Sequence, residues 1–185
     1  DEDASHNNTQ SLLAATTLNP EKILKRMSSI ALGMYDDVSN GLILNDKSNL
    51  QTLSNRDVEV NRQYFLLVRL IRSTLVDKRL ANVFNLENID ILDYRIAANL
   101  LENAGDTIVE LANFIYNSSL SNEHLKKIFD IVKNFNILAE KSIDAFTKPD
   151  RRLAVEAILL HKKYQENLSK LRTTIGNKKQ IPIDL

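Results

Sequence analysis

Apolar residues recur at alternating steps of three and four along most of this chain, which is the spacing of one face of an α-helix. One such seam contains an acid among its apolar positions. The seam consists of Leu50, Leu53, Asp57, Val60, Tyr64, Leu67 and Ile71. A carboxylate withdrawn from water without a partner is costly, or it takes up a proton instead. We therefore expect Asp57 to have a partner: a cation, a neighbour rich in hydrogen-bond donors, or a metal ion.

The same periodicity predicts five long helices. They span about 19–44, 48–78, 88–117, 121–146 and 149–175. The first begins with Asn19, Pro20 and Glu21, which suit the cap and the first turn of a helix. Pro149 separates the last two helices, because proline disfavours a continuous helix before it.

Long amphipathic helices with short connections predict an all-α fold of antiparallel helical bundles. Only 4 glycines and 3 prolines are present, which leaves little turn chemistry for a fold with many strands. We expect a linker or arm at 1–18, a three-helix bundle at 19–119, a partial second bundle of two helices at 120–176, and a tail at 177–185.

Two further helices have predicted apolar faces. In the first helix the predicted seam is Ile23, Met27, Ile30, Met34, Gly41 and Leu44, with the acid Asp37 in its middle. An ion pair or a solvent-edge position is the favoured interpretation of Asp37. In the third helix the apolar arc is Leu100, Leu101, Ala104, Gly105, Ile108, Leu111, Ala112 and Ile115.

Composition excludes several classes of function. Lysine plus arginine and aspartate plus glutamate number 24 each, so no bulk charge favours nucleic acid or an anionic membrane. The absence of cysteine excludes disulfides and thiolate sites, which leaves oxygen ligands as the plentiful metal-binding groups. No apolar run has the length of a membrane span and no secretory signal opens the chain, so we expect a cytoplasmic protein.

Glu102 and Asp106 form a second acidic feature, on the third helix. They are four residues apart, so their side chains lie on the same side of the helix and repel each other unless a cation is near. Gly105 removes a side chain where a neighbouring helix or an ion could approach. The pairs Asp57/Asn61 and Glu102/Asp106 could thus face each other as a cage of oxygen ligands. The alternatives are a solvated acidic stripe on the third helix and a buried ion pair between Asp57 and Arg69 or Arg95.

These stretches resemble a known family. The residues are Arg56-Asp57-Val58-Glu59-Val60-Asn61-Arg62-Gln63-Tyr64-Phe65-Leu66-Leu67-Val68-Arg69, Leu92-Asp93-Tyr94-Arg95-Ile96-Ala97-Ala98 and Glu102-Asn103-Ala104-Gly105-Asp106. They are similar to the PhoU phosphate-uptake regulator family in its archaeal form. The resemblance implies tandem three-helix bundles with E(D)-x-x-x-D motifs that can hold multinuclear metal clusters of iron, zinc or other divalent ions, manganese and magnesium included. Asp57 and Asn61 match the motif of the second helix, and Glu102 and Asp106 match that of the third.

The chain departs from the family pattern at several positions. Asn61 stands where many relatives have aspartate, which keeps an oxygen ligand but removes a negative charge. Asn103 replaces a usual arginine, and Thr107 replaces a common histidine. The second repeat has His161 and Gln165 at the motif positions and no sixth helix, so a complete second cluster is not expected.

The resemblance also leads us to expect a fragment of a longer protein. An AbrB-like DNA-binding domain often precedes the bundles of archaeal relatives, and no such strands occur in this sequence. We therefore expect no direct nucleic-acid binding by this segment.

The resemblance implies regulation rather than catalysis. Family members restrain phosphate import and phosphate-starvation signalling through the ATPase of the phosphate ABC transporter and a sensor kinase, or through transcriptional control in the archaeal form. The residues agree, because the 3 histidines lie in separate regions and no nucleophile with an adjacent base or Gly-rich phosphate loop occurs. The alternatives are a carboxylate-bridged metal enzyme and a purely structural helical interaction module.

A homodimer is the expected assembly. An apolar seam on the last helix would lack the cover of a sixth helix, and its residues are Leu153, Ala157, Leu160, Tyr164, Leu168 and Leu171. We expect this seam to be exposed in one chain and covered by a second copy, with exchange of helices as one route.

Overall fold

The computed structural model describes residues 19–44, 48–117, 135–148 and 150–176, and these residues contain helices and no strand. The elements are α2 (Pro20–Leu44), a short 3₁₀ helix (Ser48–Thr52), α3 (Leu53–Val76), α4 (Lys78–Val83), α5 (Asn88–Asn117), α7 (Phe135–Thr147) and α8 (Arg151–Gly176). The all-α prediction is confirmed. The arm at 1–18, the tail at 177–185 and the first part of the helix expected at 121–146 lie outside the described residues.

The chain forms two compact units. Unit 1 comprises the chain up to Met34 together with Thr52–Val109, and unit 2 comprises Tyr35–Gln51 together with Glu110 onward. Helices α2 and α5 therefore each contribute to both units. The expected division into bundles at 19–119 and 120–176 stays a prediction.

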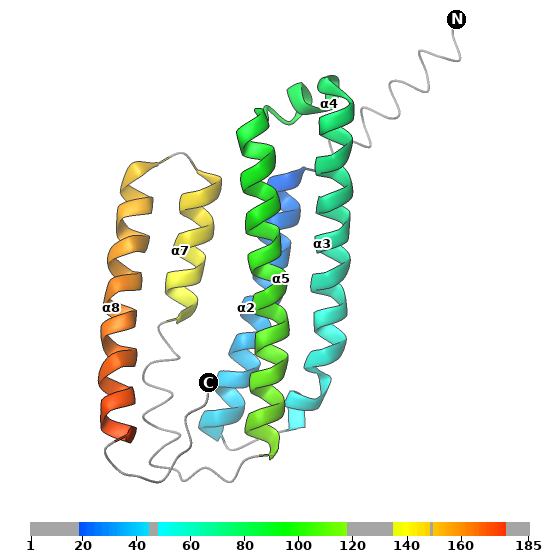
Figure 1. Ribbon diagram of the computed structural model, residues 1–185. Coiled ribbons are helices and arrows are strands. Elements are labelled where there is room, and N and C mark those ends of the chain that lie inside the picture. The colour runs from blue at the N-terminus through cyan, green and yellow to red at the C-terminus, as the bar shows by residue number, and fades with distance from the viewer. Residues whose placement is uncertain (1–18, 45–47, 118–134, 149, 177–185) are drawn as a thin grey trace, which may run out of the picture. The chain divides into compact units, whose positions relative to one another are not determined.

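Unit 1 is built from the first part of α2, from α3, and from most of α5, with each helix antiparallel to the next (Figure 1). Its core is made of buried aliphatic side chains and methionines: Ile23, Leu24, Met27, Ala31, Met34, Leu53, Val60, Leu67, Val68, Ile71, Ile91, Ala98 and Ile108. The predicted start of α2 is confirmed, because the Asn19 side chain accepts a hydrogen bond of 2.8 Å from the backbone N–H of Glu21.

The predicted seam of α3 is confirmed at its apolar positions, among them Leu53, Val60 and Ile71. Two other seams need correction. On α2, Leu44 is exposed and Ile30 only partly buried, whereas Leu24, Ala31 and Val38 are buried beside the predicted seam, so the buried face is broader than that seam. On α5, Leu100 is 64% exposed and lies outside the buried face.

The prediction of one helix from 48 to 78 was also wrong. Residues 48–52 form the 3₁₀ turn, α3 ends at Val76, and the separate helix α4 follows. Asp77 is the reason for the break: its backbone is extended, with φ −114° and ψ 102°, and its side chain accepts from the Arg79 N–H at 2.9 Å. A side chain that caps the next helix competes with continuation of the previous one.

Unit 2 contains the antiparallel hairpin of α7 and α8 (Figure 1). Leu138 and Ala157 are buried in it, and the Phe135 ring contacts Tyr35 and Tyr164 at centroid distances of 4.7 and 5.8 Å. The expectation of an exposed seam on α8 is therefore wrong. Ala157 is buried, and the other five members are only partly exposed, because this face of α8 packs toward α7.

None of the helices described above is long and apolar enough to cross a membrane.

Candidate functional site

Asp57 lies on α3 with one carboxylate oxygen in an unusual position. Its Oδ2 accepts a hydrogen bond of 3.1 Å from the Asn61 amide one turn later. Its Oδ1 is buried and has no hydrogen-bond partner among the described residues. Neither Arg69 nor Arg95 forms an ion pair with it in this part of the chain, so the structure does not supply the buried ion pair considered as an alternative.

Gly105 of α5 makes room for that buried oxygen. A Cβ atom built on Gly105 would lie 2.8 Å from Asp57 Oδ1 and 3.5 Å from Val60 Cγ1. The first distance is shorter than an ordinary contact between carbon and oxygen, so a larger residue here would displace the Asp57 carboxylate. Glycine at this position thus allows α5 to approach the part of α3 where the acid interrupts the apolar seam.

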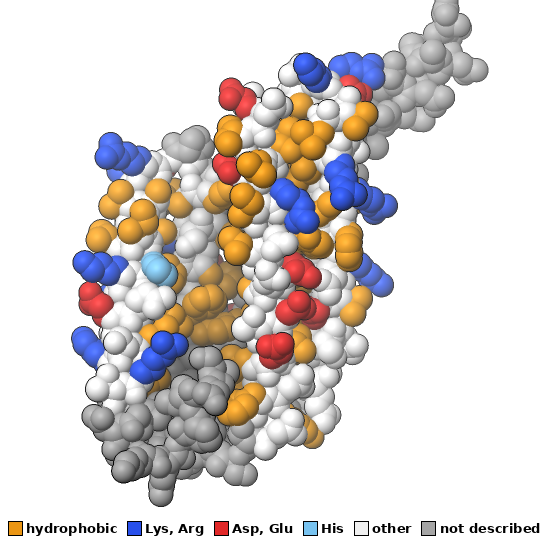
Figure 2. Space-filling model, in the orientation of Figure 1, with side chains coloured by type: hydrophobic (Ala, Val, Ile, Leu, Met, Phe, Trp, Pro, Cys, Tyr) orange, Lys and Arg blue, Asp and Glu red, His pale blue; other side chains and the backbone are white. Residues whose placement is uncertain are grey.

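Two further carboxylates of α5 lie near Asp57. Glu102 is partly exposed and Asp106 is exposed, one turn apart on the same side of the helix. Figure 2 shows acidic side chains gathered over the middle of α5, beside α3. The structure thus places Asp57, Asn61, Glu102 and Asp106 in one region of unit 1, as the sequence predicts.

The electrostatics of this group favour protonation or a bound cation. Burial raises the pKa of the Asp57 carboxyl, the charge of Asp106 raises it further, and the hydrogen bond from Asn61 lowers it. Burial also raises the pKa of Glu102, as do the charges of Asp106 and Asp57, and Arg95 opposes them. The three carboxylates therefore repel one another, and a cation between them would relieve that repulsion.

Glu59, two residues from Asp57 on α3, is an acid whose carboxylate has hydrogen-bond and ion-pair partners. It accepts hydrogen bonds from Gln63 at 2.8 Å and from Arg26 of α2 at 3.3 Å. These contacts and its ion pair with Arg62 hold the pKa of Glu59 below its usual range. Asp57 differs from Glu59 because no cationic side chain among the described residues forms an ion pair with it.

Arg95 of α5 also lies in this region, and the sequence suggested it as an ion-pair partner of Asp57. Its guanidinium carbon lies 5.0 Å from the centroid of the Tyr64 ring, a cation–π contact between α5 and α3. The i,i+3 and i,i+4 patterns of a single helix could not show this contact, because it depends on the register of two helices.

The four predicted ligands do not form a finished metal cage. No group of three or more histidine, aspartate or glutamate side chains in the described parts of the chain has an arrangement that could hold a metal ion as it stands. Two observations fit a hard cation: the unpartnered buried oxygen of Asp57 and the all-oxygen donor set. The amide nitrogen of Asn61, rather than its oxygen, contacts Asp57.

The corresponding positions of unit 2 have a different environment. His161 and Gln165 of α8 are both exposed, and the Gln165 amide lies 3.3 Å from the His161 ring nitrogen. His161 borders an apolar cavity lined by Phe135, Leu138, Ala139, Ser142, Ala157 and Ile158, which offers no carboxylate. Asp37 is partly exposed and takes part in a polar interaction.

Comparison with known proteins addresses the family. Residues 24–115 match the family model of the PhoU domain. This match supports membership of the PhoU family. The matched segment contains Asp57, Asn61, Glu102 and Asp106, and the PhoU family is a regulatory family associated with phosphate uptake. No curated protein and no solved structure gives a significant match.

Unit 1 also contains a cavity. It lies where α3, α4 and the start of α5 meet, and it is lined by Thr74, Leu75, Lys78, Ala81, Asn82, Leu86, Glu87, Asn88 and Ile89. Its ionisable groups are Lys78 and Glu87, and no histidine borders it. It therefore lacks the nucleophile with an adjacent base that covalent catalysis requires.

Proposed function

We propose that this protein regulates phosphate uptake and phosphate-starvation signalling through protein–protein contacts. The observation that carries the proposal is the PhoU-domain match over 24–115. The proposed partners are the ATPase of the phosphate ABC transporter and a sensor kinase, or the transcriptional machinery. A homodimer remains part of the proposal.

We further propose that Asp57, Asn61, Glu102 and Asp106 bind a divalent or trivalent cation, such as iron, zinc, manganese or magnesium. Support comes from the unpartnered Asp57 Oδ1 and the mutual repulsion of three carboxylates. Because these residues present no assembled cage, binding requires the Glu102 and Asp106 side chains to turn toward Asp57. The bound cation would supply positive charge at the surface of α5.

The role of the site in regulation follows from charge. Without a cation, the surface formed by Glu102 and Asp106 is negative, and with a cation this charge is reduced. A partner that contacts α5 therefore meets two surfaces of different potential, and electrostatic complementarity controls the rate and specificity of such contacts.

The test is binding of the purified transporter ATPase to the wild-type chain and to Glu102→Gln. We expect the variant to bind more weakly, since it loses a cation ligand while keeping the size of the side chain. Glu110→Gln on the same helix is the matched control, because Glu110 is exposed and lies outside the proposed ligand set. Absence of wild-type binding, or equal binding by wild type and Glu102→Gln when circular dichroism shows both folded, would contradict the proposal.

A carboxylate-bridged metal enzyme is the competing function. Such enzymes in helical bundles combine carboxylates with histidines from facing helices. The histidine that occupies a motif position in this sequence is His161. It belongs to unit 2, whereas the carboxylates belong to unit 1. Turnover of a phosphate ester or of a redox substrate by the iron- or manganese-loaded chain would favour the enzyme.

A further inference from the structure

The outward face of α8 combines exposed apolar side chains with unpaired cations. Val155, Ile158 and Leu159 are 46%, 67% and 61% exposed. Val155 and Leu159 lie on the side of the helix opposite Ala157, the residue that is buried toward α7. Ile158 lies on the flank of the helix, where it also borders the cavity shared with α7. This face is distinct from the apolar seam that packs on α7.

Basic residues border this face at both ends. Arg151 and Arg152 precede the apolar residues, Lys162 and Lys163 follow them, and all four are exposed. Arg152 is paired with Asp150 at 3.1 Å, whereas Arg151, Lys162 and Lys163 form no ion pair with any residue that the structure describes. Figure 2 shows basic side chains interleaved with hydrophobic ones along α8.

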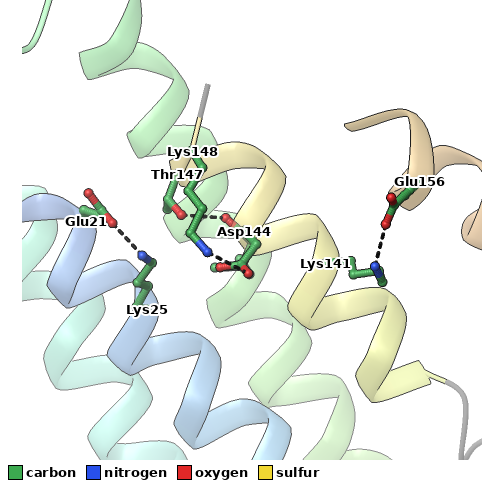
Figure 3. Close-up of polar contacts among 8 residues, drawn as sticks. Glu21, Lys25, Lys141, Asp144, Thr147, Lys148 and Glu156 are labelled. Atoms are coloured by element: carbon green, nitrogen blue, oxygen red, sulfur yellow. Dashed lines mark hydrogen bonds and ion pairs between the residues drawn. The ribbon is translucent and has the colours of Figure 1, made fainter. Parts of the chain in front are cut away.

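The nearby acids do not cancel these charges. Glu156 is bound by Lys141 of α7 at 2.6 Å (Figure 3), so its charge is already compensated. Glu166 lies one turn beyond Lys162, at the edge of the apolar group, and its carboxylate is not within ion-pair distance of Lys162. The outward face around Val155 and Leu159 therefore carries a net positive charge.

We propose that this face of α8 docks on the surface of a membrane that contains anionic phospholipids. Apolar side chains at the centre of such a face enter the boundary between headgroups and acyl chains, while Lys and Arg reach back to the phosphates through their long aliphatic stems. Each base near an anionic leaflet adds to the attraction, which salt screens.

The geometry favours a bilayer over an acidic protein segment. The outer side of a helix is a convex ridge, and a fluid headgroup layer can deform around a ridge, whereas a protein partner must supply a matching groove. Protein interfaces are dominated by anchors that fill pockets. Two cavities along α8 are shared with α7: Ala157 and Ile158 line one, and Leu160, Lys163 and Tyr164 line the other, whereas Val155 and Leu159 line neither. This inference does not depend on the proposed cation site, which belongs to the other unit.

Helix α5 provides a matched control. Ile89, Leu92, Ile96 and Leu100 form a stripe on its outward side, each at least half exposed. The exposed acid Asp93 lies between Leu92 and Ile96 along this side, so the apolar surface has an acidic neighbour. If exposed apolar area alone caused membrane binding, the α5 stripe would serve equally well.

The test is co-sedimentation of the full chain with vesicles of phosphatidylcholine and with vesicles that also contain phosphatidylglycerol. We expect binding to the anionic vesicles, little binding to the neutral ones, and weakening as salt is added. Lys162→Gln/Lys163→Gln should weaken binding by roughly tenfold or more, since each base contributes about a factor of five. Val155→Gln/Leu159→Gln should also weaken binding, because it removes the apolar side chains that would enter the headgroup boundary. Ile96→Gln/Leu100→Gln should bind like the wild type.

Three results would overturn this proposal. They are equal binding to both vesicle types, an equal loss in the α5 and α8 variants, and no vesicle binding by a folded wild-type chain. In the last case, binding to an immobilised acidic amphipathic peptide would assign the face to a protein partner instead. The substituted residues are exposed and glutamine is a good helix former, so circular dichroism should show all variants folded.

Discussion

The two units contain pairs of polar side chains with the same spacing and opposite surroundings. In unit 1, the Asn61 amide donates to Asp57 at 3.1 Å, and in unit 2 the Gln165 amide lies 3.3 Å from His161. Asp57 has a buried oxygen without a hydrogen-bond partner in the described chain, whereas His161 is exposed. The i,i+4 spacing alone therefore does not make a site.

The difference comes from the second helix. In unit 1, α5 brings Gly105 against the Asp57 carboxylate and adds Glu102 and Asp106 beside it. Around His161, the residues of α7 that border the same cavity are apolar or, in Ser142, neutral. The candidate site therefore depends on the packing of α3 on α5.

The largest effect is expected from Gly105→Val. Its Cβ would meet Asp57 Oδ1 and Val60, and such overpacking typically costs about 1–3 kcal/mol in the free energy of unfolding. Urea unfolding measures the change. Gly33→Ala is the control, because its Cβ would meet only the mobile end of the Arg56 side chain, and alanine favours the helix. A Gly105→Val chain as stable as the wild type would show that α3 and α5 do not approach closely at Asp57.

Asp57→Leu should have the next largest effect, in the opposite direction. It removes a carboxylate with an unpartnered buried oxygen and keeps a similar volume, so the metal-free protein should gain about 1–2 kcal/mol. Unfolding in the presence of a chelator measures this gain. A loss of stability would mean that the Asp57 carboxylate stabilises the metal-free fold, which contradicts this prediction.

The dependence of stability on pH should reveal the same carboxylates. Their pKa values are raised in the folded protein, so the folded state holds its protons more tightly than the unfolded state. Stability should therefore fall as pH rises from the ordinary carboxyl range through the raised folded values, and remain lower above them. Asp57→Asn should lose part of this dependence in chelator. A wild-type profile identical to that of Asp57→Asn would contradict the assigned repulsion.

The smallest effect is expected from His161→Ala. The side chain is exposed and its polar contact is with a neighbouring exposed amide, so the free energy of unfolding should change by less than about 0.5 kcal/mol. Cation uptake should also be unchanged. A large loss of either property would make the His161/Gln165 pair of α8 equivalent to the Asp57/Asn61 pair of α3 and remove the contrast between the two units.

Sequence periodicity predicted the helices well where one face is buried. The bounds of α5 agree with the prediction, and Asp57 interrupts the buried seam at the predicted position. The periodicity missed the break at Asp77. An aspartate can lie on the solvent face of a continuous helix or cap the start of a new one, and only the backbone conformation of Asp77 distinguishes these two cases.

The proximity of the four candidate residues could be predicted from the sequence, but their geometry could not. The spacing on each helix placed Asp57 with Asn61 and Glu102 with Asp106, and the structure brings the two pairs together. The contact of Gly105 with Oδ1 and the position of Arg95 over Tyr64 depend on the register between helices, which a single-helix pattern does not contain. The same limit explains why the α8 seam that contains Ala157 was wrongly predicted to be exposed. Helix α7 covers this seam, and the pattern of α8 alone does not show that neighbour.

The most direct measurement is elemental analysis of the protein purified without chelators or affinity metals, together with Asp57→Ala and Glu102→Ala. The account predicts a divalent or trivalent ion at reproducible stoichiometry in the wild type and its loss in both folded variants. A wild type that stays metal-free after titration with iron, zinc, manganese and magnesium would contradict it, and the carboxylates of α3 and α5 would then be structural.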